Sequence, residues 1–244
     1  MNSGMYASLS GALVSVQRLD VLAHNLANVN TPGYKKDCMK FEAVMSSAQA
    51  AFPSGYAGEA PVLVAESTSI DYSAGPVSTT GNTFDLALDG EGFFVVNTPN
   101  GKAYTRQGNF RLDSNGNLVT VDGYQVMGKG GAITVQGSTV SFSAEGKISV
   151  EGVEAGALDI VTFDKPYSLK KIGQGLLEPD DPGTTARQAT GTAVMQGRLE
   201  GSNVSAVEEM VQLIETSRFF EACQRVIQNY DSMTGKAVNE LGRV

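Results

Sequence analysis

The side chains that could carry chemistry in this 244-residue chain are few and scattered. His24 is the only histidine, which excludes a metal site built from several histidines. No serine or cysteine near it has the spacing of a catalytic relay. Gly90-Glu91-Gly92 lacks the third glycine and the following helix of a dinucleotide-binding loop. We therefore predict no catalytic residue, no cofactor and no metal site.

Asp113-Ser114-Asn115-Gly116-Asn117 resembles the start of a calcium-binding loop, in which oxygen ligands alternate along the chain. However, Gly116 precedes the third ligand position instead of following it, and Tyr124 stands where the bidentate glutamate belongs. A hairpin turn explains the segment better. An exported enzyme with a β-rich body is the alternative from another functional class, and no constellation of residues supports it.

The net charge of −8 and the isoelectric point near 4.7 argue against a nucleic-acid partner, because phosphate binding requires a basic surface. The pairs Lys35-Lys36 and Lys170-Lys171 are interpreted as solvated loop charges. The chain has no apolar run long enough to span a membrane, so we expect it not to be membrane-inserted. The first 17 residues lack lysine and arginine, so we expect export without a cleaved signal peptide.

The N-terminal segment has the apolar spacing of a coiled-coil helix. This pattern predicts a helix from about Ser3 to Ala27. Its end is set by Pro32, which cannot continue a helix, and by Gly33, which allows a positive φ. The seam residues repeat with alternating steps of four and three: Met5, Leu9, Ala12, Val16, Leu19, Ala23 and Leu26.

The C-terminal segment shows the same alternation over a longer stretch. A helix from Val204 to Leu241 would be about 57 Å long, with Ser202 or Asn203 as its N-cap. The predicted seam residues are Leu213, Thr216, Phe220, Cys223, Ile227, Tyr230, Thr234, Ala237 and Leu241.

The central part changes to short apolar runs separated by turn residues, which predicts an antiparallel β domain from about Gly81 to Thr162. Residues 165–190 are expected to be extended and weakly structured, and 192–199 to form one returning strand. The predicted fold class is α+β: terminal coiled-coil-like helices paired into one helical domain, with a central antiparallel β domain. The predicted divisions are listed here: 1–45, N-terminal helix and exit turn; 46–80, extended connector; 81–200, β domain; 201–244, C-terminal helix.

The two terminal helices could pack only on each other and on the β domain. However, a helix of about 57 Å is much longer than a compact domain of some 80 residues, whose radius of gyration is roughly 12 Å. Part of its apolar surface therefore needs neighbouring molecules. We expect contacts that build a filament from copies of this chain.

Three segments resemble the motifs of bacterial flagellar rod and hook proteins, and they follow the order found in that family. They are listed here: Asn25-Leu26-Ala27-Asn28-Val29-Asn30-Thr31-Pro32-Gly33-Tyr34-Lys35; Asp85-Leu86-Ala87-Leu88-Asp89-Gly90-Glu91-Gly92-Phe93-Phe94 with Tyr104-Thr105-Arg106-Gln107-Gly108-Asn109-Phe110; and Leu199-Glu200-Gly201-Ser202-Asn203-Val204. Chain length and the form of the third motif favour the proximal-rod type of this family, with the distal-rod type as the alternative.

The resemblance implies a tubular rod in the basal body that crosses the periplasm, transmits torque and surrounds the export channel. The implied partners are copies of the chain, other rod subunits and the flagellar type III export apparatus, and the termini are expected to be disordered before assembly. Asn25, Asn28, Thr31 and Gly33 are expected to shape the exit from the first helix. The expected assembly interface comprises these four residues with Met5, Leu9, Val16, Leu19, Leu26, Leu213, Phe220, Ile227, Tyr230 and Leu241.

Overall fold

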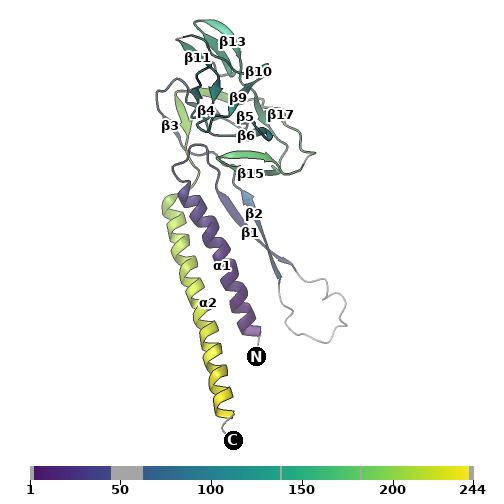
Figure 1. Cartoon of the computed structure of the whole chain (residues 1–244), viewed down its shortest axis with the longest axis vertical. Coiled ribbons are helices and arrows are strands. Elements are labelled where there is room, and N and C mark those ends of the chain that lie inside the picture. Colours follow the sequence, from purple (N-terminus) through teal and green to yellow (C-terminus); the bar gives the residue numbers. More distant parts are fainter. Residues whose placement is uncertain (1–2, 45–62, 138, 182, 242–244) are drawn as a thin grey trace. The chain divides into compact units, whose positions relative to one another are not determined.

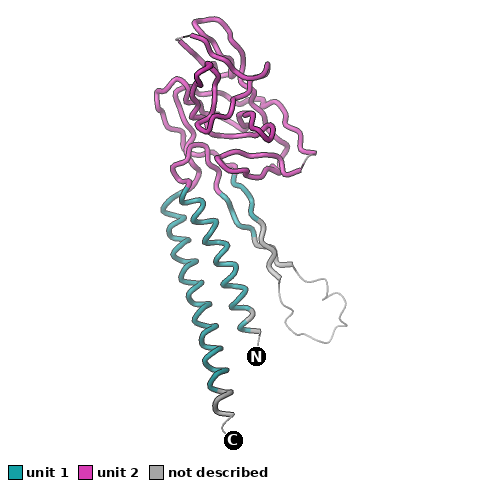
Figure 2. The backbone as a smooth tube through the Cα atoms, in the orientation of Figure 1, with its two compact units in different colours: residues 1–27, 37–71, 205–244 teal, residues 28–36, 72–204 magenta. Residues whose placement is uncertain are grey.

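The computed structural model describes residues 3–44, 63–137, 139–181 and 183–241. The chain forms two compact units, shown in different colours in Figure 2. Unit 1 contains residues 1–27, 37–71 and 205–244, and unit 2 contains residues 28–36 and 72–204. The four predicted divisions stay predictions, whereas the antiparallel sheets and the two terminal helices confirm an α+β fold.

Unit 1 consists of two helices and a β-hairpin. Helix α1 (Ser3–Ala27) has the predicted bounds, and α2 (Ala206–Leu241) begins two residues later than predicted. The two helices lie side by side (Figure 1). Strands β1 (Asp37–Val44) and β2 (Leu63–Ile70) pair antiparallel. No helix among the described residues combines the length and the hydrophobicity that a membrane span requires.

The face of α1 that packs on α2 coincides only in part with the predicted seam. A Cβ atom on Gly4 would lie 2.6 Å from Tyr230 Oη, and one on Gly11 would lie 3.3 Å from Cys223 Sγ. Ser15, Leu22 and Asn25 are buried, as is Ala12 of the predicted seam, whereas the seam residues Leu9 and Val16 are exposed. The packing stripe is thus shifted by one residue, because small side chains allow the closest approach of two helices.

The predicted seam of α2 is buried or half-buried from Leu213 to Tyr230, whereas Thr234 is exposed. Thr216 and Cys223 are buried, and Leu213, Phe220, Ile227 and Tyr230 are half-buried. Leu241 ends α2, but its side chain lies outside the described residues. The helix starts after Ser205 rather than after the predicted caps. The Asn203 side chain does not cap it, because its oxygen accepts the backbone N–H of Lys36.

Unit 2 is built from antiparallel strands. Its largest sheet has the order β15-β16-β6-β5-β9-β8-β7, with β14 also paired to β5 and to β17, and β10 paired to β9. Smaller sheets join β11-β12-β13, β18-β4 and β19-β3. The strands are β3 (Val77–Thr79), β4 (Leu86–Asp89), β5 (Phe93–Thr98), β6 (Gly101–Thr105), β7 (Arg111–Leu112), β8 (Leu118–Val119), β9 (Gln125–Gly128), β10 (Gly131–Ala132), β11 (Val140–Phe142), β12 (Lys147–Val150), β13 (Val153–Ala157), β14 (Ile160–Thr162), β15 (Leu169–Gly173), β16 (Leu176–Pro179), β17 (Arg187–Gln188), β18 (Ala193–Gln196) and β19 (Arg198–Glu200).

Strand β5 is covered on both faces, because side chains alternate between the two sides of a strand and Phe93 to Val96 are all buried. Phe94 and Val96 belong to the main hydrophobic core. Phe93 faces the other way, within 6.1 Å of the ring of Tyr72 and 6.0 Å of that of Phe163. The sheet therefore carries an apolar core on one face and an aromatic layer on the other.

Two sequence predictions about the end of unit 2 were wrong. Residues 165–190 are not weakly structured throughout, because β15 and β16 pair as a hairpin and β16 continues onto β6 of the main sheet. The returning segment forms two strands rather than one: β18 pairs with β4 and β19 with β3. They are separated at Gly197, whose φ of 72° turns the chain between them.

The Asp113 segment forms a turn, as the sequence predicted. The carboxylate of Asp113 accepts the backbone N–H groups of Asn115 (2.7 Å) and Asn117 (2.8 Å) and the side-chain amide of Asn117 (2.9 Å). These hydrogen bonds hold the pKa of Asp113 below its usual range, and the bond from the Asn117 side chain has the largest effect.

This lowered pKa gives a prediction about pH. The carboxylate stabilises the folded form fully above its ordinary pKa, and this contribution is lost as the pH falls below about 4. Asp113→Ala is expected to lower the thermal midpoint of unit 2 by about 2 °C at pH 7 and by less at pH 3. Melting curves at the two pH values test this, with Asp122→Ala as the control; an equal loss at both would contradict it.

Candidate functional site: the motif junction and the helix faces

The exit from α1 is a tight turn made by the first motif. Thr31 donates its backbone N–H to the carbonyl of Asn28 and its hydroxyl to the Asn28 side chain, both at 3.1 Å. Gly33 follows with a φ of 66°, a left-handed conformation that glycine adopts without strain. Asn28, Thr31 and Gly33 therefore occupy the exit turn, although any role in assembly stays a prediction.

Gly33 is also the point where the first and third motifs meet. Its N–H donates to the carbonyl oxygen of Glu200 at 2.7 Å. A Cβ at this position would lie 2.4 Å from the backbone carbon of Arg106, so only glycine fits. Three segments from distant parts of the chain thus come together at one residue. We call residues 28–36, 73–75, 106 and 200–203 the motif junction.

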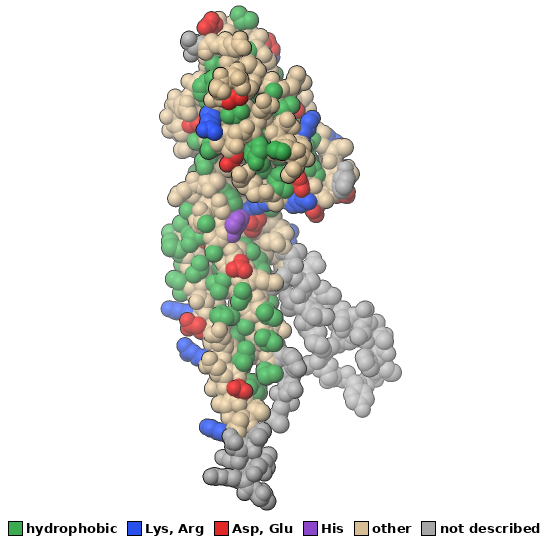
Figure 3. Space-filling view, viewed as in Figure 1, with side chains coloured by type: hydrophobic (Ala, Val, Ile, Leu, Met, Phe, Trp, Pro, Cys, Tyr) green, Lys and Arg blue, Asp and Glu red, His purple; other side chains and the backbone are tan. Residues whose placement is uncertain are grey.

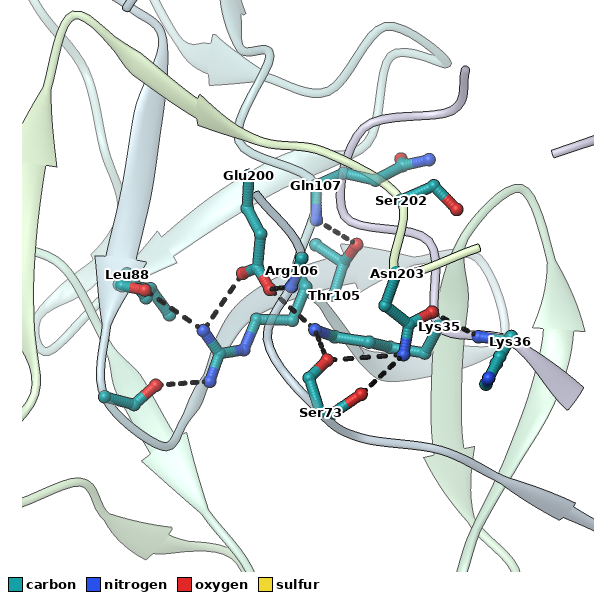
Figure 4. A network of polar contacts seen from close by, with 12 residues as sticks. Lys35, Lys36, Ser73, Leu88, Thr105, Arg106, Gln107, Glu200, Ser202 and Asn203 are labelled. Carbon is teal, nitrogen blue, oxygen red and sulfur yellow. Dashed lines mark hydrogen bonds and ion pairs between the residues drawn. The ribbon is translucent and has the colours of Figure 1, made fainter. Parts of the chain in front are cut away.

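Lys35, Arg106 and Glu200 form a buried ion cluster at the centre of the motif junction (Figure 4). Lys35 Nζ lies 2.6 Å from Glu200 Oε1, and Arg106 Nη1 lies 3.1 Å from Glu200 Oε2. The side chains of Lys35 and Glu200 are only 3% and 2% exposed. The interpretation of Lys35 as a solvated loop charge was therefore wrong, because its partner lies 165 residues away in the sequence.

The remaining bonds of the ion cluster go to backbone groups. Glu200 Oε1 also accepts the N–H of Gly75 at 3.0 Å, and Lys35 Nζ donates to the carbonyl of Ser73 at 2.7 Å. Arg106 donates to the carbonyls of Leu88 at 3.3 Å and Gly90 at 2.5 Å. These bonds hold five separate backbone segments together. The arrangement suits a structural tie, since the charged groups bind one another and the backbone.

Asn203 fastens the same segments a second time. Its side-chain oxygen accepts the N–H of Lys36 at 2.7 Å, and its backbone N–H donates to the carbonyl of Tyr34 at 3.3 Å. Its amide nitrogen donates to the carbonyl of Ser73 at 3.3 Å (Figure 4). The third motif is therefore bound along its length to the first.

Asn25 binds the chain just beyond the exit turn. Its side chain binds the backbone of Asp37, accepting the N–H and donating to the carbonyl, both at 2.9 Å. It also donates to Glu209 Oε2 at 3.3 Å. Asn25 is buried and joins α1, β1 and α2 within unit 1, and its predicted part in shaping the exit from α1 stays a prediction.

Asn25→Ala is expected to make the amide of Asp37 exchange about 10 to 100 times faster, because a buried peptide group loses its partner at a cost of about 1–3 kcal/mol. Amide hydrogen exchange on the full chain measures this. Asn30→Ala, at an exposed position of the same motif, is the matched control. Unchanged exchange at Asp37 would show that the bonds are not needed.

Large apolar side chains remain exposed on both helices (Figure 3). Successive residues of a helix are about 100° apart, so Leu13, two residues from both Gly11 and Ser15, points away from α2. On α2 four of the seven exposed large apolar side chains lie within the first nine residues of the helix. The large apolar side chains described as exposed on the two helices are Leu9, Leu13, Val16, Val207, Met210, Val211, Ile214, Phe219, Val226 and Met233.

The predicted interface residues thus fall into two groups. Leu9 and Val16 are exposed, whereas Met5, Leu19 and Leu26 are half-buried in the chain itself. Sequence reasoning gave no role to Arg106 and Glu200, although both lie in the motifs. Their positions inside the motifs were the available signal. Among the described residues, no group of histidine, cysteine and carboxylate side chains could hold a metal ion.

Comparison with protein families gives three matches along the chain. The "Flagella basal body rod protein" model matches residues 5–35, the "Flagellar hook protein FlgE/F/G D1 domain" model matches 87–150, and the "Flagellar basal body rod FlgEFG protein C-terminal" model matches 195–240. None of these models describes a catalytic domain.

Named relatives match over the whole length. The flagellar basal-body rod protein FlgG of Bacillus subtilis is 37% identical over 261 residues, covering 98% of this chain and 99% of the relative. FlgF of Rhizobium meliloti is 32% identical over 245 residues, with 99% of each chain covered. FlgF of Caulobacter vibrioides is 31% identical over 249 residues, with 100% of each covered. This chain belongs to the flagellar basal-body rod family.

The three matched regions of this rod-family chain meet in the ion cluster. Lys35 ends the first region, Arg106 lies in the second and Glu200 in the third. Asn25 and Glu209 likewise join the first region to the third within unit 1. The family motifs therefore contribute to the internal ties of the subunit.

Proposed function

We propose that this rod protein is a structural subunit that polymerises through the exposed apolar faces of α1 and α2. The proposal rests on the exposure of Leu13: its side chain is 60% exposed on the side of α1 opposite to α2. Burying such side chains releases roughly 25 cal/mol for each Å² of apolar surface. Neighbouring subunits that cover both helix faces would therefore stabilise a polymer.

The length of α2 supports the same proposal. The helix has 36 residues, about 54 Å at 1.5 Å per residue, and α1 has 25. Met233, near the C-terminal end of α2, is 58% exposed. Neighbouring copies are the partners that would cover it. The predicted interface residues Met5, Leu9, Val16, Leu19, Leu26, Leu213, Phe220, Ile227, Tyr230 and Leu241 remain part of this proposal.

In this function the chain forms part of the basal-body rod, transmits torque and surrounds the export channel. Its partners are copies of itself, other rod subunits and the type III export apparatus. No catalytic step is included, since the named relatives are rod proteins.

The proximal rod is the proposed position. The alignments with the two FlgF relatives span 245 and 249 residues, close to the 244 of this chain, whereas the FlgG alignment spans 261 and so needs more gaps. The higher identity to FlgG supports the distal rod as the second candidate. Immunogold labelling of isolated basal bodies tests both: label at the rod base supports the first, label at the hook end supports the second, and its absence from the rod contradicts both.

A further inference from the structure

The motif junction ties the chain at matched distances from the two helices. Gly33 lies six residues after the end of α1, and Glu200 lies six residues before the start of α2. These two residues are joined by the 2.7 Å hydrogen bond between N–H and carbonyl. Each helix is therefore attached to one common point by a short connection of equal length.

The tie extends over several residues on each side. The first segment, 33–36, and the third, 200–203, are joined by backbone bonds at Gly33 and Tyr34 and by the Asn203 side chain at Lys36. The Lys35–Glu200 ion pair lies among these bonds. A slip of one residue would turn the Lys35 side chain to the opposite side and leave the Glu200 carboxylate without this partner. The ion pair therefore selects one alignment of the two segments.

We propose that the motif junction is a preformed clamp that sets the alignment of α1 with α2 before assembly, with Lys35 as its positioning residue. The clamp lies wholly within unit 2, so it forms together with the β-sheets and does not require folded helices. It acts in the single chain, and its role is therefore additional to the proposed assembly function.

The length of the connections gives the expected effect. With the clamp formed, about 12 residues separate the two helices; without it, the first segment is released back to residue 72. The pairing of Asp37 with Ile70 shortens this path, so the separation grows to about 20 residues while the β1–β2 hairpin is paired and to about 50 when it is open. The effective concentration of one helix near the other scales as the −3/2 power of this length. This concentration falls about twofold while the helices and the hairpin stay folded, and about threefold if both are unfolded, because the residues of the helices then lengthen both loops.

The equilibrium constant for forming a disulfide between α1 and α2 reports the effective concentration of one helix near the other. Gly11→Cys places a thiol beside Cys223, since a Cβ on Gly11 lies 3.3 Å from Cys223 Sγ, within reach of a disulfide. The test uses the unassembled full chain with Gly11→Cys and Cys38→Ser, equilibrated in glutathione buffers of graded potential. The equilibrium constant for the disulfide between the thiol introduced on α1 and Cys223 is measured with and without Lys35→Met.

Lys35→Met is expected to lower this constant about two- to threefold, and Lys35→Arg to restore most of it. The matched control is Lys170→Met, which removes a surface ion pair of 2.9 Å to Glu178 in the same unit. An unchanged constant for Lys35→Met, with unit 2 still folded by its melting curve, would overturn the proposal.

A second measurement uses the wild-type chain and therefore does not depend on whether a variant folds. In the unassembled wild-type chain, the amides of residues 33–36 and 200–203 are expected to exchange as slowly as those of β5 and β6. Exchange at the rate of an unfolded chain in these segments would overturn the clamp. Neither readout involves a polymer, so failure of the proposed rod assembly would leave both results interpretable.

Discussion

Leu13→Asp is expected to abolish incorporation of the chain into rods while leaving its own fold intact. Leu13 is exposed in the single chain, so a carboxylate there costs little in the monomer. In a polymer the same carboxylate would be buried against apolar neighbours at a cost of several kcal/mol. Incorporation measured by quantitative blotting of isolated basal bodies should fall more than about 100-fold.

Two controls separate an interface effect from misfolding. Leu13→Met keeps an apolar side chain of similar volume and should be incorporated normally. Leu19→Asp is a less clean test, because Leu19 is half-buried in the single chain and its replacement would disturb unit 1 as well. Near-normal incorporation of Leu13→Asp would show that this face of α1 is not an assembly interface.

Glu200→Gln is expected to destabilise unit 2 by about 3–5 kcal/mol, which makes it the largest effect on stability that we predict. The substitution keeps the shape of the side chain but removes the negative charge between Lys35 and Arg106. Two buried cations then lose their common carboxylate. Urea unfolding followed by near-ultraviolet circular dichroism measures the free energy of unfolding of unit 2.

The matched control for this prediction is again Lys170→Met. Its ion pair with Glu178 is exposed, so its loss should cost less than about 1 kcal/mol. The contrast tests whether burial, rather than the mere presence of an ion pair, gives the ion cluster its effect. A loss below about 1 kcal/mol for Glu200→Gln would mean that unit 2 is held by its cores alone.

The helices were well predicted because their signals are local. The apolar repeat, together with Pro32 and Gly33, gave the bounds of α1. The face of α1 that contacts α2 was not predictable in the same way. An apolar repeat indicates that a helix face favours burial but not which molecule covers it. In addition, Gly4, Gly11 and Ser15 lie at the helix contact although their residue types give no apolar signal.

The motif junction could be predicted only in part, because its partners are distant in sequence. Turn chemistry at Asn28 and Gly33 was readable from local residue types. The burial of Lys35 depends on Glu200, 165 residues away, and nothing in the Lys35-Lys36 pair indicates it. The β15–β16 hairpin was missed for a related reason: its stability comes from pairing with β6, which overrides a polar and glycine-rich composition.

Protection of a thiol at position 13 in assembled rods tests whether the exposed face of α1 is covered by a neighbouring subunit. The chain carries Leu13→Cys in a background with Cys38→Ser and Cys223→Ala, and the rate of maleimide labelling is compared in the unassembled chain and in isolated rods. We expect fast labelling in the free chain and labelling slowed at least about tenfold in rods, because a neighbouring subunit covers this face. Equal labelling rates in the two states would contradict assembly through the exposed face of α1.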